Sequence, residues 1–182
     1  QGGNASLSGA STGGYFGVDG DDPADNTVGA VVSKGGTEVA NYWNDTNQSV
    51  EVTVPVGNDA TLEDGEIQLQ AEADGNFENI GDVYTILDTD LGNNTTKVMT
   101  VTDVQVEALA GYSNGDVLTW RAVIKDKSNN STTYSNSATT LTVSNDPPTV
   151  VSVLGGDNTG VYKKLNEKIE MTVKFSANVT RT

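Results

Sequence analysis

The chain has 182 residues, with 25 acidic and 10 basic residues that give a formal net charge of −15, and it contains neither cysteine nor histidine. This charge repels nucleic acid and other polyanions, whereas it attracts cations and suits an extracellular setting. Only oxygen atoms remain for metal binding or nucleophilic chemistry, and every apolar run is far shorter than the roughly 20 residues of a membrane span.

Apolar and polar residues alternate along much of the chain, which predicts strands with one buried face. In chain order, the alternating segments are 50–56, 67–73, 104–108, 118–124 and 169–175. Turn-forming residues separate them at 58–59, 63–65, 74–76, 91–94, 113–116 and 128–130. No segment has a convincing helical period. Short strands at this spacing predict an all-β fold, specifically a Greek-key β-sandwich.

An internal repeat with an offset near 120 residues divides the chain. Segment 18–23 resembles 143–148, and the strand 50–56 resembles 169–175, with Tyr42 and Tyr162 upstream of them. We therefore predict a closing strand of a preceding repeat or an N-terminal arm at 1–20, a complete sandwich at 21–146, and the opening strands of a following repeat at 147–182. This last part needs more chain or another subunit to complete its sheet and core.

Two regions resemble known families. Residues 109–126, followed by 128–131 and 134–136, resemble the last two strands of fibronectin type III and related immunoglobulin-like modules, with Trp120, Arg121 and Asp126 at motif positions and Leu118 in place of the first aromatic residue. Segments 146–153, 160–162 and 168–176 resemble the openings of immunoglobulin-like repeats in large bacterial or archaeal surface adhesins. The resemblance implies a sandwich fold, a cell-surface location and adhesion. It is specific for architecture only, because such modules carry many unrelated tasks.

The aromatic residues depart from the family pattern. The usual second-strand tryptophan is missing from 50–56, and Trp43 lies upstream of that strand. Either the core packs differently, or Trp43 fills the same space from a neighbouring strand. Tyr42 and Trp43 could also form an aromatic platform for sugars. Because adjacent strand residues face opposite sides, a split with one ring in the core is favoured.

Acidic clusters at the two predicted junctions indicate calcium, which takes six to eight oxygen ligands. The candidate ligands are Asp19, Asp21, Asp22 and Asp25 at the first junction, Asn145 and Asp146 at the second, and Asp88 and Asp90 in a weaker internal cluster. By resemblance to the Asn-Asp-Pro junctions of cadherin-like arrays, bound calcium would stiffen the chain into a rod. The alternative is that these acids are solvated and only begin or end strands, and for the internal cluster a plain loop is favoured.

Asn-x-Ser/Thr sequons could carry glycans if the source organism glycosylates its exported proteins. They lie at Asn4, Asn44, Asn47, Asn93, Asn94, Asn129, Asn130 and Asn178. Catalysis is not predicted, because the carboxylates lie in turns or on outward strand positions and no nucleophile motif is present.

Three functions follow in order. The first is a structural or adhesive module of a repetitive extracellular surface protein, stiffened by calcium, whose partners are neighbouring repeats. The second is a subunit of a self-assembling filament or surface layer, completed by strand addition from an identical copy. The third is a carbohydrate-binding accessory module that uses Tyr42, Trp43 and Tyr112 against a surface glycan.

Overall fold

The computed structural model describes residues 19–146, 150–155 and 171–175. In these ranges the strands are β1 (Val31–Lys34), β2 (Tyr42–Trp43), β3 (Ser49–Val56), β4 (Glu66–Glu72), β5 (Glu78–Thr85), β6 (Thr95–Thr102), β7 (Val117–Lys125), β8 (Ser131–Thr133), β9 (Leu141–Val143), β10 (Val150–Gly155) and β11 (Met171–Phe175). The helical elements are one short helix, α1 (Asp103–Glu107), and two 3₁₀ turns, η1 (Ala60–Leu62) and η2 (Asp88–Asp90). None of the helices in the described ranges is long and apolar enough to cross a membrane.

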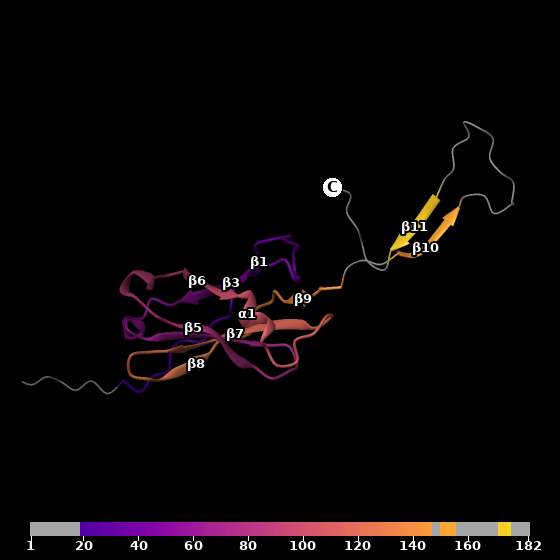
Figure 1. Cartoon of the computed structure of the whole chain (residues 1–182). Helices are drawn as coiled ribbons and strands as arrows, with labels where there is room; N and C mark the ends of the chain where they lie inside the picture. Colours follow the sequence, from indigo (N-terminus) through magenta and orange to yellow (C-terminus); the bar gives the residue numbers. More distant parts are fainter. Residues whose placement is uncertain (1–18, 147–149, 156–170, 176–182) are drawn as a thin grey trace, which may run out of the picture.

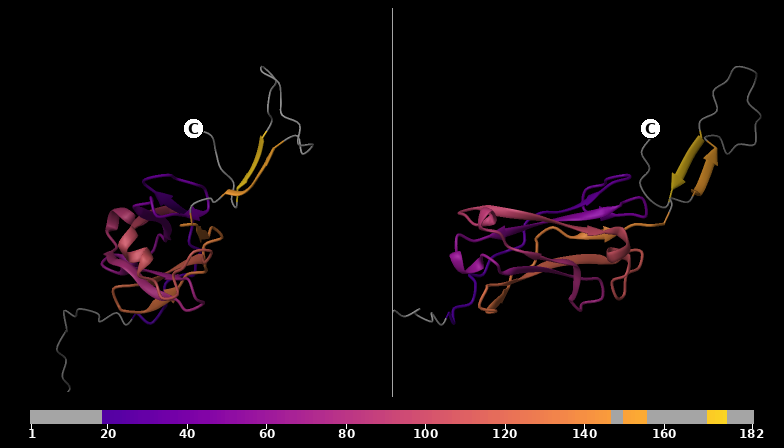
Figure 2. Two further views of the ribbon diagram at one scale, coloured as in Figure 1. Left: turned by 45° about the vertical axis from the view of Figure 1, so that its right-hand side comes forward. Right: turned by 60° about the vertical axis from the view of Figure 1, so that its left-hand side comes forward.

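Two sheets lie face to face and form a sandwich (Figures 1 and 2). The first sheet has the strand order β1-β3-β6, and the second has the order β2-β9-β7-β4-β5 with β8 also paired to β7. All of these pairings are antiparallel except that of β2 with β9, which is parallel. The predicted all-β sandwich is therefore confirmed, whereas its Greek-key assignment stays a prediction.

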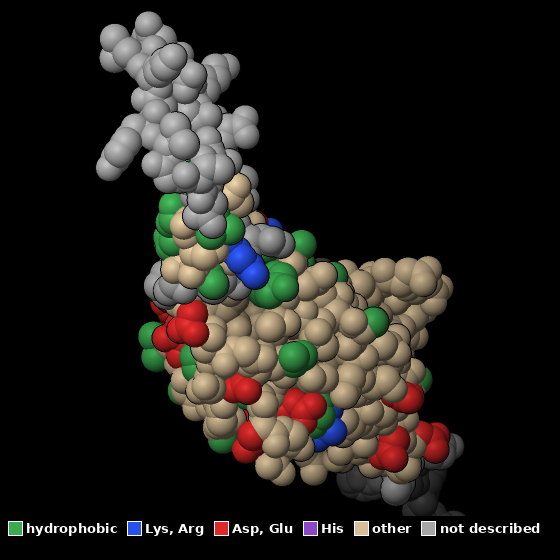
Figure 3. Space-filling view, turned by 90° about the vertical axis from the view of Figure 1, so that its right-hand side faces the viewer, with side chains coloured by type: hydrophobic (Ala, Val, Ile, Leu, Met, Phe, Trp, Pro, Cys, Tyr) green, Lys and Arg blue, Asp and Glu red, His purple; other side chains and the backbone are tan. Residues whose placement is uncertain are grey.

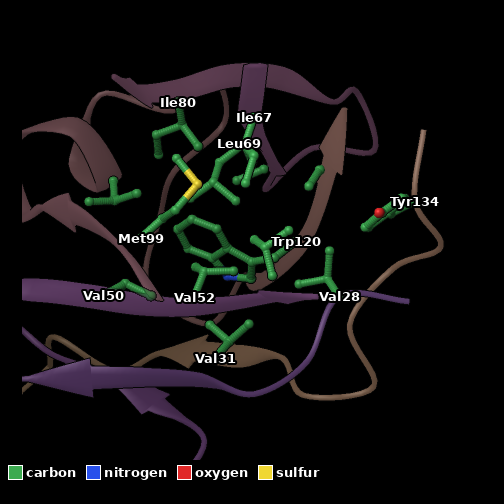
Figure 4. Packing of buried hydrophobic residues seen from close by; sticks show 14 of the residues in the cluster. Val28, Val31, Val50, Val52, Ile67, Leu69, Ile80, Met99, Trp120 and Tyr134 are labelled. Carbon is green, nitrogen blue, oxygen red and sulfur yellow. The ribbon is translucent and has the colours of Figure 1, made fainter. Parts of the chain in front are cut away.

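The core lies between the sheets and follows the predicted alternation. Every second residue is buried along the central strands, namely Val50, Val52, Val54 and Val56 of β3, Ile67, Leu69 and Ala71 of β4, and Leu118, Trp120, Ala122 and Ile124 of β7. Trp120 lies between the two layers, with Val52 on one side and Leu69 on the other (Figure 4). Fully burying one such aliphatic side chain contributes about 1.5–3 kcal/mol, so the shared core locks the sheets together.

Trp43 enters this core from β2. Its side chain is fully buried, whereas Tyr42 is 44 % exposed, so the predicted split of the pair is confirmed. An aromatic platform built on both rings is therefore wrong, because β2 turns them to opposite sides.

The alternating segment 104–108 forms no strand, and this prediction is wrong. Residues Asp103–Glu107 form helix α1, which begins at a capping box. Thr102 N donates to Gln105 Oε1 at 3.0 Å, and Gln105 N donates to Thr102 Oγ1 at 3.4 Å. These bonds satisfy backbone donors that a strand would have left to a neighbour, and only Val106 of the helix is buried.

Strands β10 and β11 form a separate antiparallel hairpin, with an irregularity between Val150 and Ser152. The predicted strand 169–175 is thus observed from Met171 onward. Ile169, Tyr162, Asn4, Asn178 and the arm 1–18 lie outside the described residues.

Candidate functional site

The chain is fixed to one end of the sandwich through residues 19–27, and we call this end the N-terminal pole. Asn130 Nδ2 donates to the Asp19 carbonyl at 3.2 Å, and Thr132 Oγ1 donates to the Pro23 carbonyl. Ser135 N donates to the Asn26 carbonyl at 2.8 Å. The segment therefore lies along β8 and the residues that follow it.

Asp126 organises the turn that holds this segment. Its Oδ1 accepts hydrogen bonds from Ser128 N at 2.8 Å and Asn130 N at 2.9 Å, and its Oδ2 accepts one from Asn130 Nδ2 at 2.8 Å. Burial raises the pKa of Asp126, but the hydrogen bonds from Asn130 and Ser128 outweigh burial and hold the pKa below its usual range. The ionised carboxylate thus ties the β7–β8 turn to the incoming chain through Asn130.

The chain leaves the sandwich at the C-terminal pole, which comprises the turn 112–116 and residues 144–146. Asn114 Oδ1 accepts a hydrogen bond from Asn145 N at 2.8 Å, and Asn114 Nδ2 donates to Asp146 Oδ2 at 2.7 Å. The Tyr112 hydroxyl accepts hydrogen bonds from Asn145 Nδ2 at 2.9 Å and Trp43 Nε1 at 3.0 Å. The last residues before Pro147 are therefore bonded to a core tryptophan.

Tyr112 remains a neutral phenol in this network. Burial raises the pKa of its hydroxyl, the hydrogen bonds from Asn145 and Trp43 lower it, and the negative charges of Glu107 and Asp45 raise it again, for a net increase. A neutral hydroxyl suits an atom that accepts two hydrogen bonds beside carboxylates.

The two poles lie at opposite ends of the sandwich. Asn114 precedes β7 and Asn130 follows it, and this strand has nine residues. At about 3.3 Å per residue the strand is about 30 Å long. The indigo segment and the orange strand β9 accordingly meet opposite ends of the sandwich (Figure 2, right).

The acidic residues predicted to bind calcium are not gathered at one point. At the N-terminal pole, Asp21, Asp22 and Asp25 are exposed, and Asp19 Oδ1 accepts a hydrogen bond from Asp21 N at 3.2 Å. No three acidic side chains in the described ranges form a group that could hold a metal ion. Around the C-terminal pole, too, the acidic side chains are scattered (Figure 3).

Three buried oxygen atoms at the poles nevertheless have no protein partner among the described residues. They are Asp19 Oδ2 at the N-terminal pole, and Asp116 Oδ2 and Asn145 Oδ1 at the C-terminal pole. Buried oxygens of this kind are normally satisfied by a water or an ion. Sequence reasoning missed Asp116, whose place opposite Val143 becomes visible only once β7 and β9 are paired.

The internal cluster is structural. Asp90 Oδ2 accepts hydrogen bonds from the Tyr84 hydroxyl at 2.7 Å and Leu87 N at 3.0 Å, and Asp90 Oδ1 lies 3.6 Å from Lys97 Nζ. Burial raises the pKa of Asp90, but these hydrogen bonds and the Lys97 charge produce a net decrease. Asp88 is exposed. The protein supplies its own cation to Asp90, which favours the plain-loop interpretation of this cluster.

The sequons fall into two groups. The Asn47 side chain is 3 % exposed, donates to the Gly35 carbonyl at 2.8 Å and accepts a hydrogen bond from Asn44 N at 2.8 Å. Asn44 Nδ2 donates to the Thr37 carbonyl at 2.8 Å. Asn130 is held by Asp126 as described above, whereas three sequon side chains are exposed to solvent, those of Asn93, Asn94 and Asn129. Only this second group offers amides that a glycan could reach without opening the fold.

No protein-family model matches this chain, and its sequence matches none of the curated proteins. Its function is therefore inferred from the arrangement of its own residues.

Replacing Asp126 with Asn should lower the free energy of unfolding at pH 7 by about 1–3 kcal/mol, because the new amide group would face the donor Asn130 Nδ2. The folded-state pKa of Asp126 is lowered, so its contribution is present above the unfolded-state pKa and is lost as pH falls through the folded-state pKa. Urea denaturation between pH 7 and pH 2 should show a weaker acid dependence in Asp126→Asn. Asp82→Asn, at an exposed carboxylate of β5, is the control, and an unchanged acid dependence in Asp126→Asn would contradict the assignment.

Proposed function

We propose that the chain is a non-catalytic structural and adhesive module of a repetitive extracellular surface protein. One observation carries the proposal: the sandwich receives the chain at one pole and releases it at the opposite pole. Modules joined in this way extend in a line, since each contacts only its neighbours. The hydrogen bonds of Asn130 and Asn114 fix the chain at both ends, which suits a spacer.

The hairpin supports a tandem arrangement. Strand β10 pairs with β11 in the antiparallel sense, as β1 pairs with β3. In sequence, residues 168–175 match 49–56, with Val173 at the position of Val54. The register differs, because Met171 lies opposite Gly155 whereas the corresponding Val52 lies opposite Val31. The order of the strands thus recurs, as expected for the opening of a second immunoglobulin-like module.

A non-catalytic role is supported by what the perturbed carboxylates do. Asp90 and Asp126, whose pKa values are lowered, are both held by hydrogen bonds that stabilise turns. Neither faces a second carboxylate across a cleft, the arrangement that glycoside hydrolysis uses.

Calcium at the junctions is part of this proposal. The buried oxygens of Asp116 and Asn145 have the donor chemistry that calcium prefers, and Asp19 offers a third such atom at the other pole. The described residues provide too few ligands at either pole, so the adjoining module would supply the rest. Such sharing would stiffen a joint between modules.

A second candidate function, self-assembly into a filament or surface layer, is favoured by the apolar side chains of the hairpin. The paired residues Val150 and Phe175 share one face with Val153 and Val173, and all four side chains are exposed. A second copy could cover this face or add a strand to the open edge of β11.

A protein made of two complete copies in tandem tests the spacer. Small-angle X-ray scattering should give a maximum dimension close to twice that of the single chain, because each sandwich leads the chain from pole to pole. Asn114→Ala removes both bonds to Asn145 and Asp146 and should broaden the distribution of dimensions, whereas Thr100→Ala on the outer face of β6 should not. A compact pair of sandwiches lying side by side would contradict the proposal.

Calcium should raise the melting temperature of the tandem protein, since a ligand at one hundred times its Kd stabilises the folded state by about 2.7 kcal/mol. Asp116→Asn should reduce this shift, and Asp82→Asn should leave it unchanged. Identical melting curves in calcium and in a chelator would remove calcium from the proposal.

Self-assembly is tested by sedimentation of the 182-residue chain over a range of concentrations. If the hairpin is the contact, the mean mass should rise with concentration, and Val173→Glu should keep the chain monomeric. Val98→Glu, at an exposed position on β6, should behave like the unsubstituted chain. A monomer at every concentration would argue against this second function.

A further inference from the structure

A row of polar side chains crosses the outer face of the second sheet. Gln70 of β4 is paired with Asn79 of β5 on one side and Arg121 of β7 on the other. Arg121 Nε donates to Gln70 Oε1 at 2.8 Å, and Gln70 Nε2 donates to Asn79 Oδ1 at 2.9 Å. The Arg121 guanidinium also lies 3.9 Å from the centre of the Phe77 ring. The row is therefore held in one arrangement before any ligand binds, which lowers the entropic cost of binding.

A shallow groove of about 340 Å³ adjoins this row. Its lining combines the amides of Gln68, Gln70 and Asn79 with the apolar side chains of Val83 and Val123. The register of β4 and β5 shifts between Ile67 and Leu69, so β5 bulges where it passes Gln68. Gln68 Nε2 donates to the Leu69 carbonyl at 2.9 Å and the Ile80 carbonyl at 3.1 Å, which fixes this amide as well.

The charges beside the groove balance. Lys125 Nζ lies 3.7 Å from Glu66 Oε2 at one end, and Arg121 stands on the strand next to Glu72 at the other. A polyanion would be repelled by the chain as a whole, whose net charge is −15. A cationic partner would gain more from the uncompensated acids elsewhere on the surface. This face therefore suits a neutral ligand.

We infer that this groove binds neutral carbohydrate, which makes the outer face of the second sheet the adhesive surface of the module. A sugar presents hydroxyl groups beside apolar C–H faces, and the groove presents amide and guanidinium groups beside valine side chains. The inference rests on the proposed function and adds to it the class of partner. Because the chain enters and leaves at the poles, neighbouring modules in a row would leave this side face open.

Affinity gel electrophoresis of the 182-residue chain tests the inference, with dextran, mannan and xyloglucan as neutral probes and polygalacturonate as the anionic probe. At least one neutral polysaccharide should slow the chain. Gln70→Ala and Asn79→Ala should each weaken that retardation about tenfold, since each removes a hydrogen-bonding group worth about 1–1.5 kcal/mol. Thr100→Ala, on the outer face of the first sheet, is the matched control. Melting temperatures of all variants show whether the fold is intact, and the exposed position of Asn79 on an edge strand makes it the safer variant.

Several results would overturn the inference: no retardation by any neutral probe, retardation by polygalacturonate alone, or equal retardation of the folded Asn79→Ala variant and the unsubstituted chain. None of them alters the scattering of the tandem protein, so the spacer function and the carbohydrate surface fail separately. Conversely, a compact tandem protein that still binds a neutral polysaccharide would retain the binding surface and exclude the linear array.

Discussion

Burial of alternate side chains along β3, β4 and β7 is the constraint on which the other features depend. With Trp120 between Val52 and Leu69, neither sheet can slide without opening a cavity next to a large aromatic ring. The strands of both sheets therefore keep one long direction, and the turns are confined to the two ends. The positions of the poles, and of the polar row on the outer face, follow from this packing.

The polar networks at the poles extend the core to the surface. Trp43 is fully buried, yet its indole nitrogen bonds to Tyr112, which in turn accepts a hydrogen bond from Asn145. The direction in which the chain leaves the sandwich is thus set by a core residue. Asp126 and Asn130 do the same for the incoming segment, although they act through a turn rather than through an aromatic ring.

Local patterns predicted those parts of the molecule that depend on a single strand. The alternation in 50–56 and 118–124 predicted which side chains are buried, and adjacent positions on one strand predicted the split of Tyr42 and Trp43. The same rule failed at Val104, because the capping box of Thr102 and Gln105 is a stronger local signal than three alternating residues. Contacts between segments distant in sequence were not predictable in this way. The partners of Asn47, the orphan oxygen of Asp116 and the row of Asn79, Gln70 and Arg121 all depend on which strands become neighbours.

The parallel pairing of β2 with β9 has a mechanical consequence. Strand β2 belongs to the early part of the chain and β9 to its end, and the hydrogen bonds between them lie across the long direction of the sandwich. A force that draws the two ends of the chain apart pulls these strands past each other, so the bonds share the load and must rupture together instead of opening one after another. The bridge between Thr27 and Ser135, which is also parallel, adds a second shear contact in the same direction. A surface filament under flow would gain tensile strength from this geometry.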